Sequence, residues 1–217
     1  MFTGIIEEVG TVSNLKKQAK SLVMTIQASI VLEDVQLGDS IAINGVCLTV
    51  TSFTSNQFDV DVMPETFDST SLKSLEVGSK VNLERAMAAN GRFGGHFVSG
   101  HVDGVGTIIK RQMVENALYM TIQAPKACLP FFMLKGSVAI DGTSLTIFHV
   151  EEDTLTISLI PHTRGATILA EKKIGDQVNI ECDMLAKYVQ QMLQPVETEK
   201  DKESKITMDF LEANGFM

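Results

Sequence analysis

The stretch Ser99-Gly100-His101-Val102-Asp103-Gly104-Val105-Gly106-Thr107-Ile108 is a second copy of Thr3-Gly4-Ile5-Ile6-Glu7-Glu8-Val9-Gly10-Thr11-Val12. Three further blocks repeat in the same order at an offset of 97 residues, pairing 40–50 with 137–147, 63–66 with 160–163, and 77–84 with 174–181. A long period that occurs only twice indicates a tandem domain duplication, because solenoid repeats are shorter and need at least three copies. We therefore expect two related domains that each fold around a core of their own.

Each copy reads as a series of short strands with little helix. β-rich runs broken by Gly, Asn and Pro occupy residues 22–28, 41–50, 58–62 and 80–85, and again 118–124, 138–148, 155–160 and 177–182. Short helices are expected at 69–75 and 166–170. Strands at this spacing predict an all-β fold of two closed barrels, since closure removes the exposed edges of a small sheet.

The strand pattern stops near Met184. Residues 184–193 carry Leu185, Val189 and Met192 at helical spacing, and Pro195 ends the run. A charged, exposed segment at 197–205 and a second short helix at 206–214 are expected after it. An apolar stripe on a helix that follows a finished barrel favours a subunit interface over packing on its own barrel.

The composition narrows the functional classes. The 217 residues are 44% hydrophobic and 21% charged, and no apolar run approaches the ~18 to 20 residues of a membrane span. The N-terminus has neither a basic region nor a long apolar stretch, which predicts a cytoplasmic protein without a signal peptide. A net charge of −9 argues against a nucleic-acid partner. Three cysteines without CxxC spacing predict neither a metal site nor a disulfide framework.

Positions that differ between the copies point to chemistry. His101 stands where the first copy has Ile5, Ser144 where it has Cys47, His162 where it has Glu65, and Asp183 where it has Ala86. These exchanges would make two similar pockets chemically unequal, although one copy could instead have kept the site alone. Cys47 can also be a buried small hydrophobe and His101 a structural residue. His96 and His101 are expected on opposite faces of a strand, which disfavours a shared metal site.

Several motifs together carry a family resemblance. They are Met1-Phe2-Thr3-Gly4-Ile5-Ile6-Glu7, Asn44-Gly45-Val46-Cys47-Leu48-Thr49-Val50, Met63-Pro64-Glu65-Thr66, Asn82-Leu83-Glu84-Arg85-Ala86, Gly94-Gly95-His96-Phe97-Val98-Ser99-Gly100-His101-Val102 and Asp141-Gly142-Thr143-Ser144-Leu145-Thr146. From residue 1 to about 187 the chain resembles riboflavin synthases of the bacterial alpha-subunit type. The resemblance implies a dismutation: one 6,7-dimethyl-8-ribityllumazine gives a four-carbon unit to another, yielding riboflavin and 5-amino-6-ribitylaminouracil without cofactor or metal.

The same resemblance implies an architecture. We expect two six-stranded Greek-key barrels, one lumazine-binding barrel over residues 1–97 and another over 98–187, followed by a helical oligomerisation segment and tail at 188–217. It also implies a cytoplasmic homotrimer with two lumazines per active site, formed by the N-terminal barrel of one subunit and the C-terminal barrel of its neighbour. Lumazine synthase is a candidate partner.

The implied site residues fall into two matched sets. The catalytic candidates are Cys47, His101, Ser144 and Asp183, with His101 the natural group to take a proton from the 7-methyl of one lumazine. Substrate contacts are expected in the first barrel at Gly4, Ile5, Ile6, Cys47, Leu48, Thr49, Asp61, Val62, Met63, Pro64, Glu65 and Thr66. In the second barrel they are expected at Gly100, His101, Val102, Lys135, Ser144, Leu145, Thr146, Ser158, Leu159, Ile160, Pro161, His162 and Thr163.

Two other functions are compatible with such barrels. A lumazine-binding antenna protein would share the fold and the duplication but hold one chromophore without catalysis. The polar groups present in both ligand segments argue against it, since a degenerate second barrel would lose them. A flavin-dependent oxidoreductase is disfavoured because no dinucleotide-binding βαβ unit follows.

Overall fold

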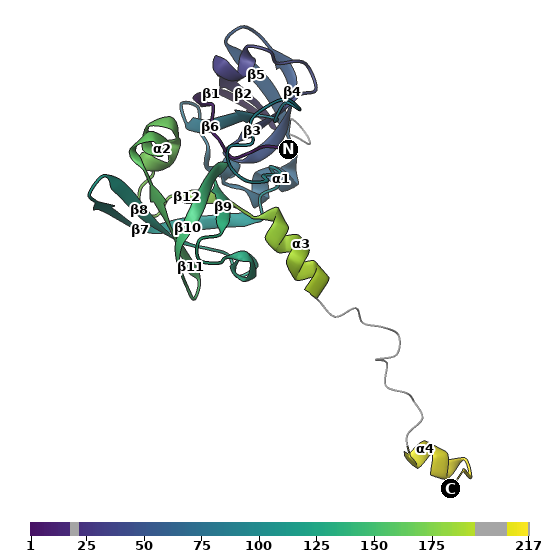
Figure 1. Ribbon diagram of the computed structural model, residues 1–217. Coiled ribbons are helices and arrows are strands. Elements are labelled where there is room, and N and C mark those ends of the chain that lie inside the picture. The colour runs from purple at the N-terminus through teal and green to yellow at the C-terminus, as the bar shows by residue number, and fades with distance from the viewer. Residues whose placement is uncertain (18–21, 194–207, 217) are drawn as a thin grey trace. The chain divides into compact units, whose positions relative to one another are not determined.

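The computed structural model describes residues 1–17, 22–193 and 208–216 and contains two closed antiparallel barrels of six strands each (Figure 1). The first barrel is built from β1 (Glu8–Lys17), β2 (Leu22–Gln27), β3 (Ser40–Ile43), β4 (Val46–Phe53), β5 (Gln57–Val62) and β6 (Lys80–Arg85). The second is built from β7 (Gly104–Val114), β8 (Ala117–Gln123), β9 (Ser137–Ile140), β10 (Thr143–Glu151), β11 (Thr154–Leu159) and β12 (Gln177–Cys182). The predicted fold class is confirmed.

Strand order in both barrels is that of a Greek key. The first runs β1-β2-β5-β4-β3-β6, and the second follows the same path with β7 to β12. In each, three strands joined in sequence (β3-β4-β5 or β9-β10-β11) are flanked by a fourth that returns beside the first of them. Alternate residues of each strand point inward, so each barrel has a separate apolar core, with Met24, Ile26 and Val60 in one and Met120, Ile122 and Ile157 in the other.

Two runs predicted as single strands are hairpins instead. The expected strands at 41–50 and 138–148 are each broken by a two-residue turn, Asn44-Gly45 or Asp141-Gly142. All four turn residues have positive φ, between 44° and 79°, which is the conformation of the tight turn that Asn-Gly and Asp-Gly favour. The prediction was wrong because it weighed the apolar run above its turn signal.

The short helices begin earlier than predicted. Helices α1 (Pro64–Ser69) and α2 (Pro161–Ala166) both start at a proline, whose fixed φ suits a first helical position. The stretches expected to be helical are the single 3-10 turns that follow, η2 (Ser71–Ser74) and η4 (Ile168–Ala170). Two more such turns, η1 (Ile30–Leu32) and η3 (Leu129–Phe131), follow β2 and β8.

The C-terminal helices form as expected. Helix α3 spans Met184–Leu193 and α4 spans Met208–Ala213. The charged segment predicted at 197–205 lies outside the described residues. None of the helices in the described part of the chain is long and apolar enough to cross a membrane.

The two barrels meet across an approximate two-fold axis. Phe2 and Val98, which are equivalent in the two copies, pair as an antiparallel bridge and are both buried. The Asn44-Gly45 and Asp141-Gly142 turns lie against each other so closely that a Cβ on Gly45 would stand 2.6 Å from the Gly142 nitrogen. Glycine at both turns therefore allows the main chains of the barrels to touch.

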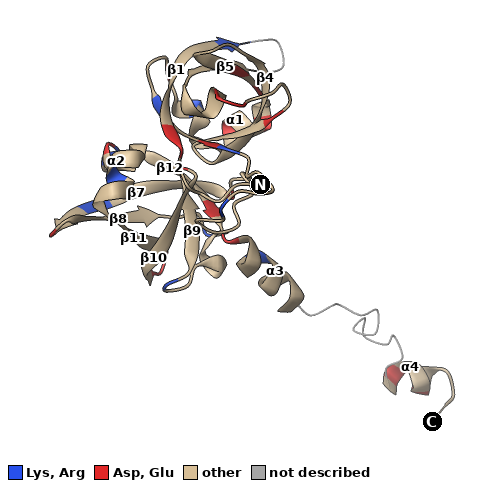
Figure 2. Cartoon of the chain, turned by 45° about the horizontal axis from the view of Figure 1, so that its top comes forward, with Lys and Arg blue, Asp and Glu red and all other residues tan. Residues whose placement is uncertain are grey.

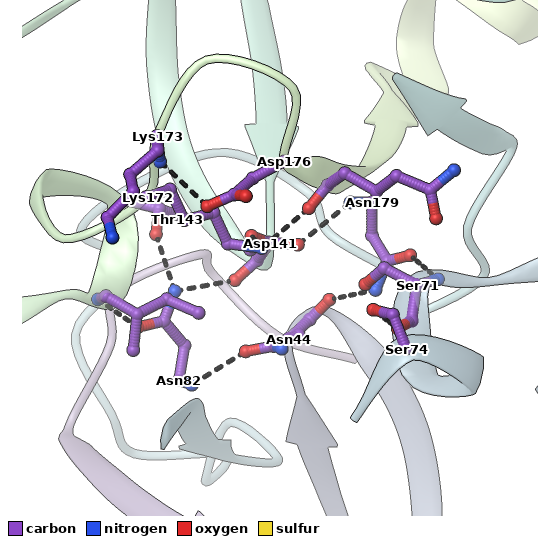
Figure 3. Close-up of polar contacts among 12 residues, drawn as sticks. Asn44, Ser71, Ser74, Asn82, Asp141, Thr143, Lys172, Lys173, Asp176 and Asn179 are labelled. Atoms are coloured by element: carbon purple, nitrogen blue, oxygen red, sulfur yellow. Dashed lines mark hydrogen bonds and ion pairs between the residues drawn. The ribbon is translucent and has the colours of Figure 1, made fainter. Parts of the chain in front are cut away.

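A buried polar network joins the barrels at this axis (Figure 3). Asn82 Nδ2 donates to the Asp141 carbonyl at 2.9 Å, and Asn179 Nδ2 donates to the Asn44 carbonyl at 2.8 Å. The amide oxygens of Asn82 and Asn179 accept from the opposite barrel too, from Ile168 N at 2.9 Å and Ser71 N at 2.7 Å. Each asparagine side chain thus satisfies main-chain groups of the other barrel, which fixes how the barrels dock.

The network is not fully symmetric. Asp141, which has no exposed surface, stands where the first copy has Asn44, and its Oδ2 lies 3.0 Å from Lys172 Nζ. Burial raises the pKa of the Asp141 carboxyl, and the neighbouring ammonium of Lys172 opposes that rise. The second copy therefore contains a buried ion pair that the first copy, with Asn44 and Leu75 at the equivalent positions, does not need.

Candidate functional site

A cavity of about 340 Å³ opens on the second barrel between β10, β11 and α2. Its lining contains seven residues of the expected contact set, together with Leu134, Ile147 and Phe148. The seven are Lys135, Ser144, Leu145, Thr146, Ser158, Ile160 and Thr163. The sequence repeat thus places separate stretches of the second copy around one hollow of a size suited to a small ligand.

The equivalent surface of the first barrel lies on β4, β5 and α1. Cys47 and Thr49 occupy β4, Asp61 lies on β5, Met63 precedes α1, and Thr66 lies in its first turn. Cys47 and Thr66 are half-buried, and Thr49, Asp61 and Met63 are exposed. These side chains face outward because neighbours along a strand alternate between the two faces of a barrel wall.

Four expected contact residues point into the cores instead. Leu48, Val62, Leu145 and Leu159 are all buried members of the two apolar clusters. Leu145 is 8% exposed and touches the cavity edge, whereas Val62 and Leu159 have no exposed surface. Any ligand contact from Val62 or Leu159 would have to come from the main chain, because both side chains are buried in the cores. Side chains alternate between the two faces of a strand, so a whole segment cannot contact the ligand through its side chains.

The structure exchanges two of the expected segments between the barrels. The sequence reading grouped Gly4 to Ile6 with Cys47 and Gly100 to Val102 with Ser144. Instead, Ser144 N donates to the Gly4 carbonyl at 2.7 Å, and Cys47 N donates to the Gly100 carbonyl at 2.9 Å. We call β4 and β10 the ligand strands, because they carry Cys47 and Ser144 of the expected set. The grouping was wrong, because the segment that leads into each barrel is hydrogen-bonded to the ligand strand of the other barrel.

Glycine is required at these two crossings. Gly4 and Gly100 have φ of 78° and 83°, and a Cβ on either would stand 2.6 Å from Ser144 Cβ or 2.5 Å from Cys47 Cβ. Val102, which follows Gly100 in the second copy, is half-buried and packs against the core cluster of the first barrel. Of the flanking expected residues, His101 and Ile5 are exposed and Ile6 is half-buried.

His96 is the residue that the sequence reading missed. Its Nδ1 lies 2.6 Å from Ser144 Oγ, its main-chain nitrogen donates to the Thr3 carbonyl at 3.1 Å, and only 8% of its surface is exposed. Neither His96 nor His101 lies on a strand, so the expectation of opposite strand faces was wrong. No repeat signal marks His96, because it precedes the second copy and has no counterpart in the first.

The surroundings of His96 favour a neutral imidazole. Desolvation lowers its pKa, and the charge of Asp183 partly opposes that effect. Its Nε2 is buried without a hydrogen-bond partner among the described residues. A neutral imidazole held in this way can exchange a hydrogen bond with the Ser144 hydroxyl in either direction.

Lys135 holds an unusual backbone conformation at the cavity. Its φ is 66°, a left-handed value that costs a non-glycine residue about 1 kcal/mol or more. The first copy has Gly38 at the equivalent position, with φ of 91°. The second barrel keeps an ammonium at the mouth of its cavity despite that cost, whereas the equivalent position of the first barrel has no side-chain charge.

The remaining expected residues lie near the helix starts. Pro64, Glu65, Pro161 and His162 are exposed in the first turns of α1 and α2. Asp183 precedes α3, where its Oδ1 accepts from Leu185 N at 2.9 Å. Asp183 therefore caps a helix in this structure, while its charge still influences His96.

A second cavity, of about 410 Å³, lies on the first barrel and shares only Ile5 with the expected set. Its wall includes several charged groups, and there Arg85 forms ion pairs with Glu7 and Asp34 at 2.5 Å each. Those carboxylates raise the pKa of Arg85, so its charge is internally compensated. Acidic and basic residues are interspersed over both barrels in the view of Figure 2.

Comparison with known proteins identifies the family. The lumazine binding domain model matches twice, at residues 3–86 and 99–183, which coincide with the two barrels. A riboflavin synthase from Bacillus subtilis (strain 168) is 58% identical over all of both chains. The chain belongs to the riboflavin synthase family. Riboflavin synthases from Bacillus amyloliquefaciens and Actinobacillus pleuropneumoniae are 53% and 51% identical, again over all of each chain.

Solved structures extend the match to ligand complexes. LumP complexed with 6,7-dimethyl-8-(1'-D-ribityl) lumazine superposes with a TM-score of 0.76, and its riboflavin complex with 0.78. Both are 27% identical in sequence and cover 84% of this chain and 99% of the LumP chain. The identity to the riboflavin synthases is about twice as high, so in sequence the chain is more similar to those enzymes than to LumP.

Proposed function

We propose that this member of the riboflavin synthase family converts two molecules of 6,7-dimethyl-8-ribityllumazine into riboflavin and 5-amino-6-ribitylaminouracil. The observation that carries the proposal is the duplicated ligand strand. Cys47 to Thr49 on β4 and Ser144 to Thr146 on β10 lie in equivalent places, and in each copy the next strand is followed by a helix that begins at a proline. Two equivalent pockets suit a reaction whose two substrates are identical.

The unequal residues assign the roles. His101 would accept the proton from the 7-methyl of the donor lumazine, with Cys47 beside its segment. Ser144, hydrogen-bonded to His96, would add to or polarise the acceptor lumazine, and Asp183 would tune the charge of His96. Holding the two rings in register would contribute much of the rate, and no step requires a cofactor or a metal.

The proposal includes the assembly. The exposed apolar side chains of Leu185, Val189 and Met192 support a homotrimer held by the C-terminal helix, with a working site between barrels of neighbouring subunits. A cytoplasmic location and an association with lumazine synthase belong to the same proposal. Sedimentation of the full chain and of a chain ending at Lys187 would separate a trimer held by the helix from a monomer.

The function is tested by incubating the purified chain with the lumazine alone. We expect one riboflavin and one pyrimidinedione for every two lumazines consumed, because the four-carbon unit lost by one molecule appears on the other. The reaction should proceed unchanged with a chelator present. Tight binding of lumazine without any riboflavin would contradict the proposal and support the antenna function.

The His96–Ser144 contact gives a second prediction. Replacing His96 with leucine should lower kcat/KM about 2- to 10-fold, the equivalent of one neutral hydrogen bond of about 0.5–1.5 kcal/mol. His96→Asn should retain most activity, since its amide can still reach Ser144. In the Ser144→Ala background His96→Leu should cost little more; independent, additive losses would show that the two residues do not act together.

A further inference from the structure

Two buried glutamates occupy equivalent positions and bind equivalent segments. Glu84 on β6 is 4% exposed and Glu181 on β12 is 3% exposed. Glu84 Oε1 accepts from Thr3 N at 2.7 Å and Thr3 Oγ1 at 2.9 Å, and its Oε2 accepts from Gly4 N at 3.0 Å. Glu181 repeats this arrangement with Ser99 N at 2.6 Å, Ser99 Oγ at 2.8 Å and Gly100 N at 2.9 Å.

Neither carboxylate forms an ion pair within the described residues. All of the close contacts given above come from one main-chain turn and its hydroxyl, so each glutamate binds a loop rather than another charge. Burial of a carboxylate is costly unless its oxygens are filled with donors, and here both oxygens are used. A buried carboxylate whose two oxygens both accept hydrogen bonds from the turn holds that turn in one conformation.

Each turn leads directly to the ligand strand of the opposite barrel. Gly4, held by Glu84 of the first barrel, accepts from Ser144 N on β10 of the second. Gly100, held by Glu181 of the second barrel, accepts from Cys47 N on β4 of the first. The main chains are in close contact at both glycines, because a Cβ on Gly4 would overlap Ser144 and a Cβ on Gly100 would overlap Cys47.

We infer that Glu84 and Glu181 are positioning residues that act crosswise. Glu84 sets the Ser144 cavity of the second barrel, and Glu181 sets the surface around Cys47 on the first barrel together with the adjoining His101. The inference deepens the proposed function and rests on it for the meaning of the pockets. It assigns to each barrel the control of the other barrel's site within one chain. The two sites of a chain, which in the proposed assembly belong to different intersubunit reactions, are then both set at the barrel junction.

An isosteric change isolates the contact. In Glu84→Gln one oxygen can still accept from Thr3 and, at the longer distance of 3.2 Å, from Gly4 N. An amide NH2 then replaces the oxygen that accepts from Gly4 N at 3.0 Å, where two donors cannot bond. The same applies to Glu181→Gln and Gly100. Each substitution therefore removes the shorter hydrogen bond to the glycine of the turn while keeping the size of the buried side chain.

The test uses cysteine reactivity, which does not depend on turnover. Cys47 is half-buried, while Cys128 and Cys182 are 0% and 1% exposed, so a maleimide added to the full-length protein reports on Cys47. Glu181→Gln should change the rate of Cys47 labelling at least about 3-fold, and Glu84→Gln should leave it near the parent value. In a Cys47→Ser, Ser144→Cys protein the response should reverse, with Glu84→Gln effective and Glu181→Gln silent.

Milder variants keep the test informative if a glutamine variant does not fold. Ser99→Ala and Thr3→Ala each remove one hydroxyl contact to a carboxylate and should reproduce the crossed pattern more weakly. Equal effects on both reporters, or effects confined to the barrel that carries the substitution, would overturn the inference. A crossed labelling pattern in a protein that makes no riboflavin would leave the inference standing and reject the proposed function alone.

Discussion

The His101→Gln variant is expected to bind the lumazine with little loss of affinity and to turn over about 10²- to 10⁴-fold more slowly, the usual contribution of one proton-transferring group. His101 is exposed and directly follows Gly100, whose carbonyl is fixed to Cys47 of the first barrel. The main chain next to His101 is therefore held beside Cys47, while the exposed imidazole stays free to meet a ligand. Pre-steady-state and steady-state rates of riboflavin formation, together with a lumazine titration, would separate kcat from binding.

A matched control is available on the same chain. His149 on β10 is also exposed, and its one ion pair among the residues that the structure describes is with Glu151, at 3.0 Å, on the same strand. We expect His149→Gln to keep kcat and affinity within about 2-fold, because surface substitutions away from special features are usually within ±0.5 kcal/mol. Wild-type kcat in His101→Gln with binding intact would remove His101 from proton transfer.

Replacing Lys172 with leucine is expected to cost about 3 kcal/mol of stability, the largest loss we predict for a single residue outside the pockets. The change leaves the fully buried Asp141 carboxylate without its cation, and removing one partner of a buried pair typically costs ~3–5 kcal/mol. The lower end applies because the Lys172 side chain is 16% exposed. Denaturant unfolding of the parent and the variant, compared at equal m values, measures the loss.

The first copy supplies the rescue. It carries Asn44 and Leu75 where the second carries Asp141 and Lys172, so Asp141→Asn combined with Lys172→Leu recreates a pair that already exists in this fold. The double variant should recover most of the lost stability, because an asparagine oxygen can still accept from Asn179 N as Asp141 Oδ1 does at 2.8 Å. A double variant as unstable as Lys172→Leu would indicate that packing of Lys172, and not its charge, is what matters.

The loss should also depend on pH. Burial raises the pKa of Asp141, and removing Lys172 raises it further. A carboxyl with a raised folded-state pKa destabilises the fold fully above that pKa and has no effect below the unfolded value of about 3.9, where it is protonated in both states. The difference between Lys172→Leu and the parent should therefore shrink as the pH falls from 7 toward about 4. A difference that stays constant over this range would contradict the assignment to Asp141.

Local signals in the sequence brought together residues that lie around one cavity of the candidate site. The identical Leu-Thr pairs after Cys47 and Ser144 mark the two ligand strands, and seven residues predicted from the second copy line one cavity. Period-two alternation is an equally local signal, and it separates Val62 and Leu159, which are core residues, from their outward-facing neighbours. The Asn44-Gly45 turn was a local signal as well, and it was outweighed by the apolar residues around it.

The sequence by itself determined the duplication, the all-β class and the membership of the riboflavin synthase family, because repeats, alternation and motifs are properties of short stretches. Only the tertiary structure decided that Gly4 serves Ser144 and Gly100 serves Cys47, that His96 reaches Ser144, and that Lys172 neutralises Asp141. The physical reason is that the contacts to Ser144 and Cys47 join residues 48 to 140 positions apart, across or beside the junction of two barrels. Which residues contact Ser144 and Cys47 depends on how closely the barrels approach at Gly45 and Gly142. No single stretch of the chain carries that information.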